Sequence, residues 1–142
     1  MFERILVLVD GSEASSRTVH LCMDMAAVLG SHVYALNVVS PLPTVSLLAD
    51  YIEGDGCFTR VTSHAQLLLD QAKRVGDAAG VKVSTEYTFD HRPDTVAVAR
   101  ASAHGCDMVV VPGKGPGHRR AFLHDVAQGI LRSGEVPLLV CP

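Results

Sequence analysis

The chain has 142 residues, a length that suits one domain with a single hydrophobic core. Its composition, 48% hydrophobic and 19% charged, is typical of a compact α/β protein and excludes a disordered chain. The formal net charge of −3 argues against a general nucleic-acid binder, which needs a basic face, and no apolar run reaches the roughly 20 residues that cross a bilayer. We therefore expect one domain over residues 1–142, with neither nucleic acid nor membrane as a partner.

The N-terminal residues lead almost directly into an apolar run, so we expect no signal peptide and a cytoplasmic location. Four cysteines stand far apart in the sequence, and no Cys-x-x-Cys pair occurs. Reduced thiols in a cytosolic protein fit this spacing better than a disulfide framework does.

The first part of the chain predicts two buried strands on either side of a helix. Residues 5–9 form a continuous apolar run, which Asp10-Gly11-Ser12 ends. Residues 13–29 carry apolar side chains at helical spacing, and Gly30 suits the C-cap. Residues 32–39 predict a second strand. Residues 40–57 predict a long irregular connection, with a short helical turn over 47–52.

The second part of the chain continues the alternation of helices and strands. Residues 61–79 predict a long helix ended by Gly80, and residues 81–89 predict a more polar strand near a sheet edge. Pro93 suits the start of a helix whose apolar stripe is formed by Val96, Ala99 and Ala103. Residues 108–111 predict a buried strand, residues 126–132 a helix and residues 136–141 a last strand.

Five strands alternating with four helices predict a doubly wound, parallel α/β sheet with helices on both faces, a Rossmann-like fold. In such sheets ligands bind beyond the carboxyl ends of the strands, where the strand order reverses. Asp10, Val38 and the 112–125 loop all follow strand ends. Their convergence predicts a binding site at that edge of the sheet.

The loop after residues 108–111 combines glycines with basic side chains ahead of a helix. Loop amides, a helix N-terminus and positive charge together make a candidate anion cradle. The alternative is a solvated connection whose glycines only let the chain turn, and the loop by itself leaves both interpretations open. The candidate residues are Gly113, Gly115, Gly117, Arg119 and Arg120.

Four segments together resemble the universal stress protein family over essentially the whole chain. They are ILVLVDGSE at the start, ALNVV closing the second strand, DMVVVPGKG closing the fourth, and DVAQGILRSGEVPLLV at the end. The resemblance implies the strand order 3-2-1-4-5, frequent homodimers, and a role in stress resistance rather than catalysis. One branch of that family binds ATP and another does not.

Two residues match the nucleotide contacts of the ATP-binding branch. The resemblance assigns Asp10 to the aspartate that contacts the nucleotide, and Val38 to the valine that lines the adenine. The phosphate motif of that branch is Gly, two residues, Gly, nine residues, Gly, then Ser or Thr. Pro112 stands at the first glycine unless the register slips to Gly113, and Gly115 fits the second. Only eight residues then precede His124-Asp125, which replace the Gly-Ser pair.

These departures predict a degraded nucleotide or anion site. His124 places a ring where a glycine would let the backbone approach a phosphate. Asp125 cannot donate to a phosphate when ionised, and as an N-cap it would bind the helix amides itself. Its charge would cost roughly 4 kcal/mol at about 4 Å from a phosphate charge. We therefore expect ATP binding to be lost. The alternative is a genuine ATP or AMP site that uses the glycine loop in a shifted register.

Other kinds of site fit the sequence less well. A response-regulator receiver needs an acidic pair, a second acid and a lysine at strand ends, where this chain has Gly11, Asp90 and Cys141. No nucleophile and base can be paired, so we do not expect an enzyme. No histidine or cysteine pair has a short ligand spacing, so we expect no metal. His91-Arg92 reads as a solvated turn, with a small-anion role as the alternative.

The last strand predicts a homodimer. Its apolar side chains would leave an exposed sheet edge, and exposed edges favour pairing with another strand. The resemblance implies antiparallel pairing of this strand with its copy, whereas the alternative is an edge shielded by the chain's own helices. The residues concerned are Val136, Leu138, Leu139 and Val140.

Overall fold

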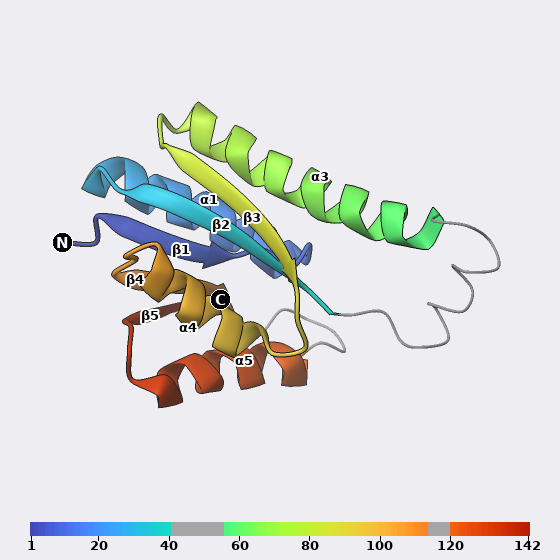
Figure 1. Ribbon diagram of the computed structural model, residues 1–142. Helices are drawn as coiled ribbons and strands as arrows, with labels where there is room; N and C mark the ends of the chain where they lie inside the picture. Colours follow the sequence, from blue (N-terminus) through green and yellow to red (C-terminus); the bar gives the residue numbers. More distant parts are fainter. Residues whose placement is uncertain (41–55, 114–119) are drawn as a thin grey trace.

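Five parallel strands form one sheet in the order β3-β2-β1-β4-β5, which confirms the expected doubly wound fold (Figure 1). The computed structural model describes residues 1–40, 56–113 and 120–142. The strands are β1 (Arg4–Leu8), β2 (His32–Val39), β3 (Val83–Phe89), β4 (Met108–Pro112) and β5 (Leu138–Cys141). The helices are α1 (Glu13–Leu29), α3 (Gly56–Ala78), α4 (Pro93–Ala103) and α5 (Arg120–Ser133). The predicted turn over 47–52 lies outside the described residues.

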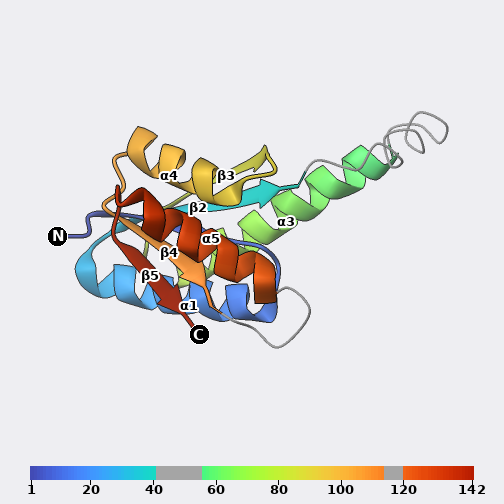
Figure 2. The same ribbon diagram turned by 90° about the horizontal axis from the view of Figure 1, so that it is seen from below.

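Helices cover both faces of the sheet. α1 and α3 lie on one face, and α4 and α5 lie on the other (Figures 1 and 2). The strand β1 contributes side chains to the hydrophobic cores on both faces of the sheet, because successive side chains of a strand point to opposite faces. Ile5 and Val7 pack in the cluster with α1 and α3, whereas Leu6 and Leu8 pack with α4 and α5. This double burial explains why β1 is a continuous apolar run rather than an alternating one.

Both ends of α1 are capped, and the C-cap is the Gly30 that the sequence predicts. The side chain of Ser12 is the N-cap and accepts a hydrogen bond from the amide of Ser15. Gly30 ends the helix with a left-handed φ of 72°, and its amide donates to the carbonyl of Ala26. These caps define the turn between β1 and α1, on which the candidate site is built.

The expected apolar stripe of α4 is wrong. Ala97 and Ala101 are the buried residues of this helix, whereas Ala99 and Ala103 are exposed and Val96 is only half-buried. Small apolar residues occur all round α4, so their spacing does not select a face. Close packing against α5 selects the buried face of α4 instead. The two helices are so close that a Cβ at Gly129 of α5 would collide with the side chain of Asp94 on α4.

The helix α5 begins at Arg120, earlier than the expected start at residue 126. The segment from 120 to 123 is rich in residues with high helix propensity, including Ala121 and Leu123, and continues the helix backwards. The backbone of Asp125 therefore lies inside the helix. The expectation that Asp125 is its N-cap is wrong.

His32, at the start of β2, should make stability depend on pH. Burial, and then Lys82 and Arg4, hold its pKa below the ordinary value of 6.5. The unfolded chain then binds this proton more readily, so the stabilisation is complete above about pH 6.5 and is lost as pH falls through the folded pKa. Urea unfolding at pH 7.5 and pH 5 should show a larger loss for wild type than for His32→Gln; equal losses would refute the assignment.

Candidate functional site

A closed set of hydrogen bonds fixes the turn after β1. The amide of Asp10 donates to Ser15 Oγ at 3.1 Å, and the amide of Ser12 donates to Asp10 Oδ1 at 2.8 Å. Gly11 between them has a φ of 85°, which disfavours a side chain. Asp10 therefore does cap a local amide, but a carboxylate has about four acceptor positions and keeps capacity for a ligand donor.

Asn37 joins the ends of the two central strands. Its side-chain amide is buried and donates to the carbonyl of Val9 at 2.6 Å, while the amide of Val9 donates to the carbonyl of Leu36. A buried amide that makes this hydrogen bond avoids the desolvation penalty of an unsatisfied group. Loss of its partner would lower the free energy of unfolding by about 1–3 kcal/mol. The pair holds the carboxyl ends of β1 and β2 in fixed relation, and with them Asp10 and Val38.

Asp10 and Val38 line one pocket of about 420 Å³ between the ends of β1 and β2 and the helix α3. The sequence expected both residues at this edge of the sheet, and the structure brings them together. Its walls combine apolar side chains with the polar side chains of Asp10, Asn37, Ser40 and His64, and such a mixture suits a small polar molecule with an apolar face. The other lining residues are Asn37, Val39, Ser40, Val61, His64, Ala65 and Leu68.

The pocket contains a residue that sequence reasoning missed. His64 projects from α3, and its Nε2 lies close to Gly11, 3.7 Å from where a Cβ on that glycine would be. His64 stands next to Ala65 and three residues after Val61, both on the apolar stripe read from the sequence. Its position beside that stripe was the signal that could have placed it at the pocket.

A second, smaller cavity of about 30 Å³ lies where the strand order reverses, between β1 and β4. Asp10 and Val38 line this cavity too, together with Val111, Pro112 and Val126. Open parallel sheets place ligands at this switch point. Asp10 thus stands at the junction of the larger pocket and the switch-point crevice.

The phosphate-motif residues are only partly described. Gly115, Gly117 and Arg119 lie outside the described residues, so their expected roles stay predictions. Arg120 is the first residue of α5, and the backbones of His124 and Asp125 lie within that helix. Amides beyond the first four of a helix bond to carbonyls four residues earlier. The positions matched to the Gly-Ser pair therefore present no free amides to a ligand.

Gly113 has a structural reason to be glycine. Its amide donates to the carbonyl of Cys141, which ties the end of β4 to the end of β5. A Cβ at this position would collide with that same carbonyl. Close approach of two backbones thus explains the residue without any ligand.

Gly113→Ala should lower the free energy of unfolding by roughly 1–3 kcal/mol, because the new methyl group must push the two strand ends apart. Urea unfolding measures this. The matched control is Gly105→Ala, where the Cβ has room but φ is 64°, so backbone strain acts without a backbone clash. A loss no greater than in the control would contradict the packing argument.

The described cysteines are unsuited to nucleophilic chemistry. Cys22, Cys106 and Cys141 are free thiols. Burial is the main cause that raises the pKa of Cys22 to about 12 and that of Cys106 to about 11, and it also raises the pKa of Cys141. All three stay protonated at neutral pH, and only a thiolate attacks or binds a metal well.

The part of the chain that the structure describes offers neither a metal cluster nor a membrane-spanning helix. No group of three His, Cys, Asp or Glu side chains within it is arranged to hold a metal ion. None of the helices, over the same part of the chain, has the length and hydropathy that crossing a membrane requires.

The fold and the pocket define a doubly wound, parallel α/β protein with a pocket at the carboxyl edge of its sheet. The chain belongs to the universal stress protein family, because the sequence model of the Universal stress protein family matches residues 1–142. This confirms the resemblance read from the sequence.

Individual relatives agree with this assignment. Universal stress protein MJ0531 of Methanocaldococcus jannaschii is 26% identical over 145 residues, which cover 99% of this chain and 82% of that protein. The universal stress protein from Archaeoglobus fulgidus in complex with dAMP is 19% identical, with a TM-score of 0.68 and all of both chains covered. A universal stress protein in complex with cAMP is 18% identical, with a TM-score of 0.69 over 98% of this chain and 95% of that one.

Proposed function

We propose that this universal stress protein is a non-catalytic, cytoplasmic stress-response domain that binds a nucleoside monophosphate of the adenosine type and binds ATP weakly. The observation that carries this is the shared pocket of Asp10, which follows β1, and Val38, which lies in β2. A carboxylate accepts hydrogen bonds from amino and hydroxyl groups, both of which adenosine offers. Valine and the neighbouring apolar wall suit the face of a base.

The relatives support the choice of a monophosphate. Two structures of the same fold are complexes with dAMP and cAMP, each an adenine nucleotide with one phosphate. The pocket volume of about 420 Å³ falls within the range of small-molecule sites, about 300–1,000 Å³.

The proposed weak binding of ATP rests on the position at which α5 begins. The helix begins at Arg120, so position 125 lies inside it and is not its N-cap. Instead, the two positions that replace the Gly-Ser pair lie inside α5, where their amides bond within the helix. The matched Gly-Ser positions thus offer no free amides to the outer phosphates, and we expect an inner phosphate near the N-terminal part of α5, whose Val126 lines the switch-point cavity with Asp10.

The test is calorimetric titration of the full chain with AMP and with ATP at physiological magnesium. We expect AMP to bind at least about tenfold more tightly than ATP, a difference of about 1.4 kcal/mol. Val38→Arg should abolish AMP binding by filling the pocket, and Val28→Arg is the matched control because Val28 is 87% exposed on α1. Tight ATP binding would favour the alternative, an ATP site in a shifted register. No binding of either nucleotide would refute the proposal.

We also propose that the domain is a homodimer through β5. This strand is an edge of the sheet, with Val140 48% exposed and Leu138 and Leu139 half-buried. An exposed apolar edge strand favours pairing with its own copy. Light scattering at micromolar protein should give twice the mass of the chain, and a monomer under these conditions would remove the proposal.

A further inference from the structure

A groove of about 400 Å³ separates the edge strand β3 from the C-terminal part of α4, on the face of the sheet away from α3. Leu6 and Leu36 contribute apolar surface to it. Polar side chains converge on the groove from three elements: Tyr34 on β2, Ser84 and Glu86 on β3, and Arg100 and His104 on α4. Convergent polar groups over an apolar floor are typical of binding sites for small molecules.

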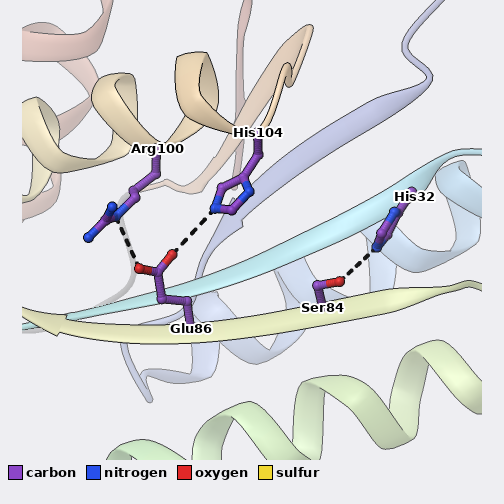
Figure 3. A network of polar contacts seen from close by, with 5 residues as sticks. All are labelled: His32, Ser84, Glu86, Arg100 and His104. Carbon is purple, nitrogen blue, oxygen red and sulfur yellow. Dashed lines mark hydrogen bonds and ion pairs between the residues drawn. The ribbon is translucent and has the colours of Figure 1, made fainter.

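A carboxylate of the protein itself is held across this groove. Glu86 reaches from β3 towards α4, where Oε1 lies 3.1 Å from Arg100 Nε and Oε2 lies 3.5 Å from His104 Nε2 (Figure 3). Arg100 on α4 and His104 at its C-cap are therefore spaced to hold the two oxygens of one oxyanion, with the proton of His104 on Nε2. Glu86 stands in for such a ligand.

The donors are held in place before any ligand arrives. The ring of Tyr34 is stacked between the rings of His32 and His104, with centroids 4.4 Å and 4.7 Å away. His32 is in turn bonded to Ser84 Oγ at 2.9 Å. This stack of three rings, with the hydrogen bond from His32 to Ser84, fixes the ring of His104 with its Nε2 towards the groove. Donors that are fixed in advance lose less conformational entropy when a ligand binds.

The surrounding charge favours an anion. The guanidinium of Arg4 donates to the carbonyl of His104, where it offsets the partial negative charge at the end of α4. Lys82 and Arg4 are both close enough to lower the pKa of His32. At the groove itself, Arg100 is the cation that faces Glu86. Asp107 is bonded to the amides of Glu3 and Arg4.

Glu86 can be displaced at little cost. The side chains of Glu86, Arg100 and His104 are 36%, 41% and 38% exposed, so solvent screens their ion pairs. Exposed pairs of this kind contribute little to stability, and a freed carboxylate at an edge strand can turn into water. The carboxylate of Glu86 therefore competes only weakly with an incoming anion for Arg100 and His104.

We propose that the groove between β3 and α4 binds a small organic oxyanion, a carboxylate or a phosphate monoester, which replaces Glu86 on Arg100 and His104. The apolar floor would cover the carbon skeleton of the ligand. The site is distinct from the Asp10 pocket, with which it shares no lining residue.

The test is titration of the ¹⁵N-labelled full chain with succinate and, separately, with glycerol phosphate, followed by amide shifts in NMR spectra. We expect saturable shifts at Ser84, Glu86 and His104, and the anion that binds more tightly identifies the class of ligand. Glu86→Gln should tighten binding about fivefold by removing the competitor. Arg100→Gln should weaken binding at least about tenfold by removing a charge-assisted donor.

Two controls keep the outcome decisive. Arg74→Gln removes an exposed arginine of α3 that donates to the carbonyl of Asp70 in its own helix and does not line the groove, and it should leave anion binding unchanged. Glu86→Ala gives a second route to an open groove if the glutamine variant is poorly folded. The proposal is overturned if neither Glu86 variant shows saturable shifts, or if Arg100→Gln binds the anion as well as wild type does.

Discussion

Ile130→Ala is expected to lower the free energy of unfolding by about 3 kcal/mol, within the usual range of 2–5 kcal/mol for such truncations. Ile130 is completely buried in the layer formed by β1, β4, α4 and α5. Removing three methyl or methylene groups there loses their burial and leaves a cavity that close neighbours such as Ala97 cannot fill. Urea or thermal unfolding measures the change.

The adjacent Leu131 provides the control. It is 69% exposed on the same helix, so Leu131→Ala should change stability by less than about 0.5 kcal/mol. Both variants introduce alanine at neighbouring positions in the last turn of α5, so differences in helix propensity nearly cancel. Equal effects of the two would mean that α5 does not present this face to the sheet.

Asp10→Ala is expected to weaken AMP binding by about 30-fold, or about 2 kcal/mol, because the ligand loses a charged hydrogen-bond acceptor. Asp10 lines both the pocket of about 420 Å³ that it shares with Val38 and the switch-point cavity. The same variant also loses the bond from the amide of Ser12, so its unfolding must be measured alongside binding.

Asp24→Ala is the matched control for charge. Asp24 is exposed on α1, so this change alters the net charge equally and touches neither pocket. AMP affinity should then stay at the wild-type value. If Asp10→Ala binds AMP normally while folding normally, the carboxylate takes no part in recognition.

The fold could be predicted from the sequence because its local signals agree with one another. The apolar run of β1, the capped helix α1 and the strand β2 were found nearly to the residue. The helix α1 carries a serine at its start and Gly30 at its end, and β1 must be apolar on both faces. The position of β3 at the sheet edge followed from its more polar composition.

The errors come from information that is not local. The buried face of α4 is chosen by its contact with Gly129 of α5, a residue far along the chain. The sequence predicts the start of α5 at residue 126 with Asp125 as its N-cap, but helix-forming residues before it extend the helix back to Arg120. His64 was missed because only the fold brings α3 across the end of β1.

The candidate site was foreseen in outline and not in detail. Asp10 and Val38 were expected at one edge of the sheet, and they share a pocket there. The phosphate-binding role of Gly113 stays a prediction, and the structure adds a packing reason for this glycine, its contact with the carbonyl of Cys141, which depends on the pairing of β4 with β5. A glycine in a loop does not reveal which neighbour excludes its side chain.

A crystal structure of the full chain grown with AMP tests the central claim most directly. We expect adenosine density in the Asp10–Val38 pocket, with the carboxylate of Asp10 within 3.2 Å of a nucleotide nitrogen or hydroxyl and one phosphate at the start of α5. An empty pocket at saturating AMP, or a nucleotide bound elsewhere on the molecule, would contradict the account.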